Sequence, residues 1–295
     1  MYNLKNYSEA DRMYDLVNEN YPMLFVLNRF GISLGFGDKN IHQVCVENQV
    51  DTATFLAVAN LLANGKTDFD REKISIEALI QYLQNSHKYF LDYRLPSIRA
   101  KLVQAIEGVN KDVSVVIIRF FDEYASDVRR HMRDEERNLF PKIKKLLENN
   151  ANASSFSRQH DHLENNISEL KNIIIKHYPA ENSNDLSSVL FDIFLCEQDL
   201  SSHILIEDRL ITARKKSEPA ERTQSSQDPL TLREKEIVVC VAKGMSNKQI
   251  ADMLFLSTHT VITHRRNIAS KLQIHSPSGL TVYAIVNKLI KMSEL

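Results

Sequence analysis

Two short stretches of the sequence each place a histidine four residues before a glutamate. His131 precedes Glu135 at this spacing, and His203 precedes Glu207, both within strongly helical sequence. Residues four positions apart share one face of an α-helix, so the imidazole and the carboxylate can reach the same metal ion. The pattern therefore predicts metal binding by side chains from two helices.

Two further histidines, His87 and His160, lie in two other predicted helices. Four helices that each contribute a histidine, two of which add a carboxylate, are typical of a dinuclear metal site inside a helix bundle. A mixed histidine and carboxylate set suits iron, manganese or zinc, and two bridging carboxylates in a bundle favour two non-haem irons. For any one histidine a hydrogen-bonded core or surface position is the simpler interpretation, but the set as a whole favours metal.

The expected turns agree with this arrangement at two of three connections. In an up-and-down bundle, residues on neighbouring helices lie at one level when they are equally far from the connecting turn. The midpoints of the pairs His87/His131 and His160/His203 fall within the predicted breaks at residues 108–110 and 178–184. The connection near residues 149–155 fits less well, because it lies closer to His160 than to Glu135.

Residues 75–214 resemble the hemerythrin-like domain of the RIC (repair of iron centres) proteins. The similarity lies in four segments, at residues 87–96, 131–141, 159–161 and 203–207. It implies a four-helix di-iron bundle with four terminal histidine ligands and two bridging glutamates: His87, His131, His160, His203, Glu135 and Glu207. Glu164 stands where hemerythrins have a further histidine, and its role as a ligand is left open.

Composition favours an all-α protein of several domains. The 295 residues suit two or three domains, and seven Gly and seven Pro are few for this length. The cysteines Cys45, Cys196 and Cys240 lie far apart and form no Cys-x-x-Cys motif, which argues against a disulfide scaffold and fits a reducing compartment. Without a signal peptide or an apolar run of membrane-spanning length, we expect a cytoplasmic protein with no membrane partner.

Residues 1–65 are predicted to form a small helical domain ahead of the bundle. This segment resembles the N-terminal domain of RIC proteins, whose loop carries a Cys-Cys pair, but Gly35 and Phe36 occupy those positions here. The thiol chemistry of that pair is therefore unavailable, and we expect a docking or dimerisation element instead. Within the bundle, Pro96 predicts a kink or break near Asp92, because proline removes a backbone hydrogen bond and clashes with the preceding turn.

The C-terminal part of the chain differs in charge from the rest. Residues 215–228 form a polar linker without aromatic residues. Residues 229–295 carry nine Lys or Arg against four Asp or Glu, a net charge of +5 within a chain whose total is −1. A basic module on an acidic body predicts an anionic partner.

Three capping residues, Thr231, Ser246 and Ser257, predict three consecutive helices in this module. The second and third, joined at residues 255–257, form a helix-turn-helix, whose last helix enters the major groove of DNA. The module resembles the LuxR/NarL-type helix-turn-helix domain at residues 230–237, 244–251 and 260–268. The resemblance implies that Thr263 and Arg266 face base edges and that four residues hold phosphates: Lys248, Thr260, His264 and Arg265. A last helix from Ser278 would serve dimerisation.

Together these features predict a transcription regulator, not an enzyme. It would sense nitric oxide, oxygen or redox state through a di-iron site and bind double-stranded DNA as a homodimer. The signal would leave through the fourth bundle helix and the linker. The alternatives are a RIC-like protein that repairs iron centres or handles nitric oxide, with a secondary DNA-binding fusion, and a bundle whose metal site is empty.

Overall fold

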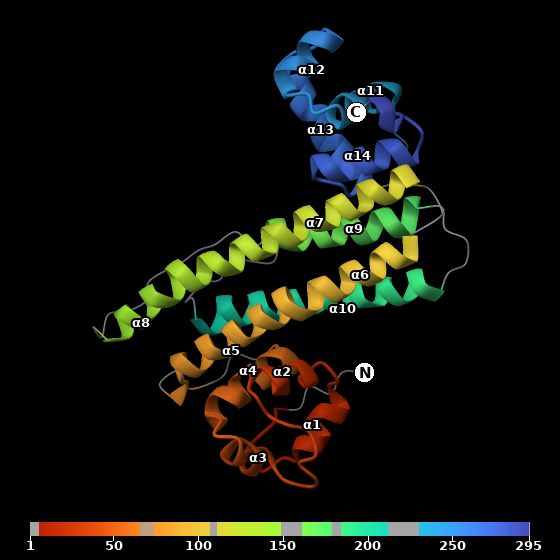
Figure 1. The fold of residues 1–295 in the computed structure, drawn as a ribbon. Coiled ribbons are helices and arrows are strands. Elements are labelled where there is room, and N and C mark those ends of the chain that lie inside the picture. The colour runs from red at the N-terminus through yellow and green to blue at the C-terminus, as the bar shows by residue number, and fades with distance from the viewer. Residues whose placement is uncertain are drawn as a thin grey trace. The chain divides into compact units, whose positions relative to one another are not determined.

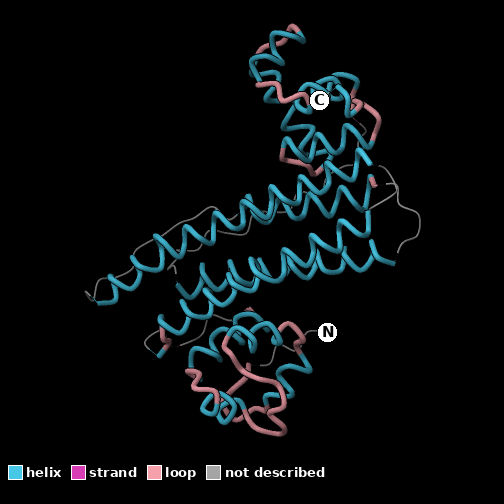
Figure 2. Tube along the Cα trace, viewed as in Figure 1, coloured by secondary structure: helices cyan, strands magenta, loops and turns pink. Residues whose placement is uncertain are grey.

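The computed structural model describes residues 6–65, 70, 73–106, 111–148, 161–178, 184–211 and 230–294. Every extended regular element in these ranges is a helix, and one isolated antiparallel bridge joins Arg12 to Asn40 (Figures 1 and 2). The all-α class predicted from the sequence is confirmed. Among the helices in the described ranges, none combines the length and the apolar character needed to cross a membrane.

The chain folds into two compact units, each built from segments that are far apart in the sequence. The first comprises Met1–Arg94, Arg130–Arg158 and Gln198–Ser217. The second comprises Leu95–Arg129, Gln159–Glu197 and Glu218–Leu295. Two long helices, α7 (Lys111–Asp134) and α10 (Asn184–Ile206), contribute residues to both units.

The N-terminal helices of the first unit share one hydrophobic core with the helices that follow. These helices are α1 (Met13–Glu19), α2 (Met23–Arg29), α3 (Ile41–Glu47) and α4 (Thr52–Asn64). Asn40 caps α3 in a capping box with Gln43, and α4 ends at Gly65, whose φ of +69° favours glycine. Their buried side chains join those of α5 (Ile76–Lys88), α8 (Phe140–Glu148) and the turn η4 (Glu207–Ile211) in a single cluster.

Three π-helical turns interrupt the long helices of the first unit. The turn η2 (Tyr89–Arg94) follows α5, η3 (Glu135–Leu139) separates α7 from α8, and η4 ends α10. The irregularity expected near Asp92 is η2, after which Pro96 lies in the first turn of α6 (Leu95–Ile106). π-Helical turns are rare and occur frequently at functional sites.

In the second unit, α6, α9 (Asp161–His177) and parts of α7 and α10 pack through apolar faces. Apolar residues at helical spacing on α7 are buried at six positions: Val113, Val116, Ile117, Phe120, Phe121 and Tyr124. Ion pairs join the helices at the surface, including Lys101 to Asp192 at 2.6 Å. These contacts form the ordinary core of a helix bundle.

The first three C-terminal helices of the second unit begin where the capping residues predict, whereas the last begins at Pro277, with Ser276 as its cap, and not at Ser278. The second unit ends with these helices. They are α11 (Leu232–Ala242), α12 (Asn247–Leu254), α13 (Thr258–Leu272) and α14 (Pro277–Val286), followed by the short 3-10 helix η5 (Met292–Glu294). Thr231 and Ser246 each form a complete capping box, and the side chain of Ser257 accepts a hydrogen bond from the backbone of Thr260. Lys271 pairs with Glu234 at 2.9 Å, which ties α13 to α11.

Candidate functional site

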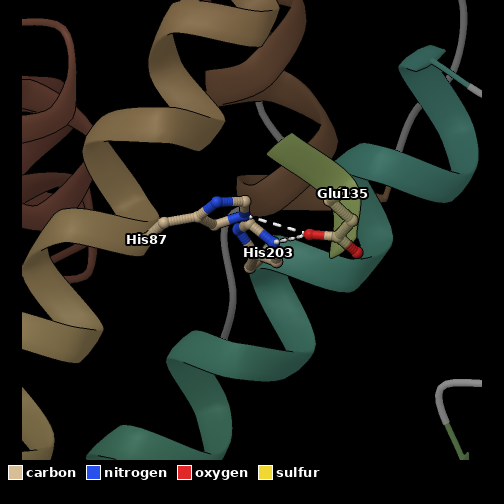
Figure 3. A group of neighbouring side chains, drawn as sticks. All are labelled: His87, Glu135 and His203. Atoms are coloured by element: carbon tan, nitrogen blue, oxygen red, sulfur yellow. Dashed lines mark ion pairs between the residues drawn. The ribbon is translucent and has the colours of Figure 1, made fainter. Parts of the chain in front are cut away.

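One group of possible metal ligands consists of His87, Glu135 and His203, which come from α5, η3 and α10 (Figure 3). Nε2 of His87 lies 3.0 Å from Oε2 of Glu135, and Nε2 of His203 lies 3.9 Å from the same oxygen. All three side chains are at most 1% exposed. Two imidazoles and a carboxylate therefore converge on one point inside the first unit.

A second group consists of His131, Glu135 and Glu207. Nε2 of His131 lies 2.6 Å from Oε1 of Glu135, and the side chain of Glu207 is buried. Glu135 thus belongs to both groups, with Oε2 toward His87 and His203 and Oε1 toward His131. A carboxylate that presents its two oxygens to two sets of ligands has the arrangement of a bridging ligand in a dinuclear site.

The distances within these groups fit a metal centre. With metal–ligand bonds of about 2.0–2.2 Å, two ligands at right angles lie roughly 3 Å apart and two opposite ligands roughly 4.2 Å apart. The distances of 2.6, 3.0 and 3.9 Å to Glu135 fall close to this range. Nε2 of His87 and Nε2 of His203 are buried and make no hydrogen bond within the described part of the chain. Buried nitrogens of this kind are the atoms that a metal ion would satisfy.

Two neighbouring side chains orient the imidazoles. Nδ1 of His87 lies 2.9 Å from Oε1 of Glu136, and Nδ1 of His203 lies 3.1 Å from Oγ of Ser86. Such contacts fix the ring and direct its other nitrogen toward the metal. The sequence analysis missed Glu136 and Ser86, although each is adjacent to a predicted ligand. Consecutive residues of a regular α-helix point in different directions, so nothing in the sequence indicates that Glu135 and Glu136 face the same histidine.

Burial determines the charge of His203, and two aromatic rings contact the imidazoles of the site. Burial lowers the pKa of His203 to about 4, although the carboxylate of Glu135 acts in the opposite direction. His203 is therefore neutral at pH 7, and the neutral imidazole is the form that binds metals. Phe140 stacks on His87 with centroids 5.6 Å apart, and the ring of Phe90 meets His203 edge-on at 6.2 Å.

Two residues considered as ligands cannot be placed. His160 lies outside the described residues, and Glu164 lies on α9 with a side chain that is not described. Of the six predicted ligands, the structure brings five together: His87, His131, Glu135, His203 and Glu207.

The residues predicted to contact DNA lie on α12 and α13. Thr263 and Arg266 are exposed, three positions apart on α13, and Lys248 is exposed on α12. The other three predicted residues are partly buried: Thr260, His264 and Arg265. Val261 and Ile268 anchor the opposite face of α13 in the core.

Arg265 and Thr263 also make contacts within the protein. Nη1 of Arg265 donates to Oδ1 of Asn247 at 2.6 Å, which ties α13 to the start of α12. Oγ1 of Thr263 donates to the carbonyl of His259 at 3.0 Å. Arg266 is the more exposed of the two arginines on α13.

Comparison with known proteins identifies two domains. Residues 78–214 match the hemerythrin HHE cation binding domain, and residues 228–284 match the luxR family of bacterial regulatory proteins. The chain thus combines a hemerythrin-like domain with a LuxR-type domain, and both of these resemblances are confirmed. No solved structure matches the chain.

Curated relatives match parts of the chain. The transcriptional regulatory protein MctR of Rhizobium johnstonii is 40% identical over 70 residues, which are 24% of this chain and 33% of MctR. The oxygen regulatory protein NreC of Staphylococcus epidermidis is 32% identical over 119 residues, 39% of this chain and 55% of NreC. NreC of Staphylococcus aureus is 42% identical over 72 residues, 23% of this chain and 33% of that protein. The chain therefore spans about a third to a half of the length of these relatives.

Proposed function

We propose that this protein is a transcription regulator that responds to nitric oxide, oxygen or redox state at a non-haem di-iron site. The observation that carries the proposal is that Glu135 belongs to two groups of histidine and carboxylate side chains that could each hold a metal ion. The same chain carries a LuxR-type domain, which supports binding to double-stranded DNA. The relatives MctR and NreC are regulatory proteins, which supports a regulatory role.

In this proposal the two groups hold one iron each. His87 and His203 would hold the first iron together with Glu135, while His131 and Glu207 would hold the second together with Glu135. His160 adds the fourth histidine of the set that the hemerythrin-like sequence implies. When bound, the two irons supply reversible binding of a small gas or a change of oxidation state. Manganese and zinc suit the same donors, so elemental analysis of the purified protein identifies the metal.

The residues around the ligands hold the site in shape. Glu136 and Ser86 keep the imidazoles of His87 and His203 in place through their Nδ1 atoms. Phe90 and Phe140 cover the rings, and the ligands of the first group are at most 1% exposed. Exclusion of bulk water in this way favours a small neutral ligand over a large or charged one.

A contact within the second unit supports a path from the bundle to the DNA-binding helices. Glu169 of α9 accepts hydrogen bonds from the backbone N–H of Ser276 at 2.9 Å and from its Oγ at 2.5 Å. The backbone N–H of His275 donates to the same carboxylate. These residues precede α14, and α9 begins directly after the predicted ligand His160. A signal can therefore travel through α9 as well as through α10 and the linker, which lies outside the described residues.

The assignment of the DNA-contacting residues is tested by two substitutions. Arg266→Ala is expected to weaken binding to the preferred sequence by roughly 1–3 kcal/mol and to relax specificity at one base pair. Lys248→Ala is expected to weaken binding to all sequences alike and to reduce the salt slope by about one, because it removes a phosphate contact. Fluorescence anisotropy with an operator selected from random duplexes, and with a scrambled duplex, measures both effects.

Lys291→Ala is the control, since Lys291 is exposed but lies beyond α14. It should leave both affinities unchanged. Equal loss of specificity in the Arg266 and Lys248 variants, or in neither, would contradict the proposed docking of α13.

A further inference from the structure

An arginine from the N-terminal helices is buried against the helices that carry the metal ligands. Arg29, the last residue of α2, is 2% exposed, and its Nη2 lies 2.5 Å from Oδ2 of Asp199 on α10. Its Nη1 donates to the hydroxyl of Tyr82 on α5 at 3.5 Å. Its backbone carbonyl accepts a hydrogen bond from Nδ2 of Asn85 at 2.7 Å. One residue of α2 thus contacts both α5 and α10.

The surroundings of this guanidinium are aromatic. Its central carbon lies 5.4 to 5.8 Å from the ring centroids of four residues: Phe25, Tyr82, Tyr89 and Phe90. Such rings attract a cation, but a buried ion pair still loses its hydration. Nε of Arg29 makes no hydrogen bond within the described residues. Apolar residues of similar size often stabilise a core as well as a buried ion pair does, so stability alone does not account for Arg29.

The contacts of Arg29 lie within about one helical turn of the first ligand group. Asp199 precedes His203 by four positions on α10, so the two share a helix face. Asn85 precedes Ser86 and His87 on α5, and Ser86 orients His203. Phe90 packs against both the Arg29 guanidinium and the ring of His203.

We propose that Arg29 is a positioning residue for the metal centre. It clamps α5 to α10 and so holds His87 and His203 at the right separation around Oε2 of Glu135. The N-terminal helices would then be part of the metal site, which assigns them a role that needs neither the missing Cys-Cys pair nor an outside partner. This inference rests on the proposed metal centre and is independent of DNA binding.

If Arg29 clamps α5 to α10, its replacement should weaken the binding of one metal ion more than that of the other. The hydrogen bonds of Arg29 with Tyr82, Asn85 and Asp199 join the two helices that carry His87 and His203. Arg29→Met should therefore weaken the metal ion held by His87 and His203 by roughly 10- to 100-fold, as loss of a supporting contact does in other metal sites. The second ion should be weakened much less. A general loss of stability would affect both ions alike.

The test is an anaerobic titration of the metal-free full-length protein with Fe(II), and with Co(II) as an optical probe of each site. Arg12→Met is the matched control, since Arg12 is an exposed arginine of the N-terminal segment that pairs with Asp38 at 3.7 Å. It should bind two ions as the unmodified protein does. The double variant Arg29→Met/Asp199→Leu removes both charges, so its metal-free form should regain stability while the first ion stays weakly bound.

Two outcomes overturn the clamp. One is wild-type binding of both ions by the double variant, and the other is an equal weakening of both ions by Arg29→Met. If the unmodified protein binds no metal above a background level, the proposed metal centre itself fails. Failure of the clamp alone is recognised because the unmodified protein then still binds two ions.

Discussion

Glu135→Ala is expected to reduce bound iron from about two ions per chain to a small fraction of that value. The reason is geometric, because Glu135 supplies one oxygen to each of the two ligand groups. Its removal leaves the first group with His87 and His203 and the second group with His131 and Glu207. The predicted ligand His160 is not counted in either group. The substitution also removes one of the two expected bridging carboxylates, which allow two cations to lie close together inside a buried site. Elemental analysis after anaerobic reconstitution and desalting measures the effect.

Two further variants separate a bridge from an ordinary ligand. His203→Ala removes one ligand of the first group, so we expect about one ion to be retained. Glu136→Ala removes only the partner of His87 Nδ1, which should weaken metal binding by roughly 10- to 100-fold without abolishing it. Retention of two ions by the Glu135 variant would contradict the assignment of Glu135 as the shared ligand.

Removal of the metal is expected to lower the Tm of the protein by roughly 5–16 °C. A ligand present at about 100 to 1,000 times its Kd stabilises the folded state by roughly 2.7–4.1 kcal/mol. For a unit of this size, 1 kcal/mol corresponds to roughly 2–4 °C in Tm. The effect is large because the buried carboxylates of Glu135 and Glu207 lose the cations that offset their desolvation.

Differential scanning calorimetry of the iron-loaded and chelator-treated protein gives this difference directly. The control is Glu135→Ala, whose Tm should be the same with and without iron. Equal Tm values for the loaded and metal-free forms of the unmodified protein would show that the buried groups bind no metal with useful affinity.

Local sequence patterns predicted the elements and most of the residues that could hold a metal ion. The spacing of His131 from Glu135 and of His203 from Glu207 is sufficient to place each pair on one helix face. Capping residues such as Thr231 and Ser246 determine where a helix starts through contacts with residues two or three positions away. These are short-range effects, so a single sequence reveals them.

The structural features that the sequence did not predict depend on tertiary contacts or on an irregular backbone. Pro96 and Pro141 each lie two residues after the end of a π-helical turn, η2 and η3, whereas nothing in the sequence indicates that a third such turn begins at Glu207. Arg29 and Asp199 are 170 residues apart, and no local pattern links them. For the same reason the sequence predicted a separate domain for the N-terminal helices, whereas their buried side chains share a hydrophobic cluster with Phe140 and Leu210.

The central claim is that the state of the iron changes the affinity of the protein for DNA. An effector can shift DNA binding only if its state differs in free energy between the conformations that do and do not bind DNA. The decisive measurement is operator affinity of the full-length protein in the metal-free, reduced, oxidised and nitric-oxide-treated states at one salt concentration. A coupling of about 1–3 kcal/mol predicts a difference of roughly 5- to 150-fold between at least two of these states, and Glu135→Ala should abolish it. The same operator affinity in every state would contradict the account.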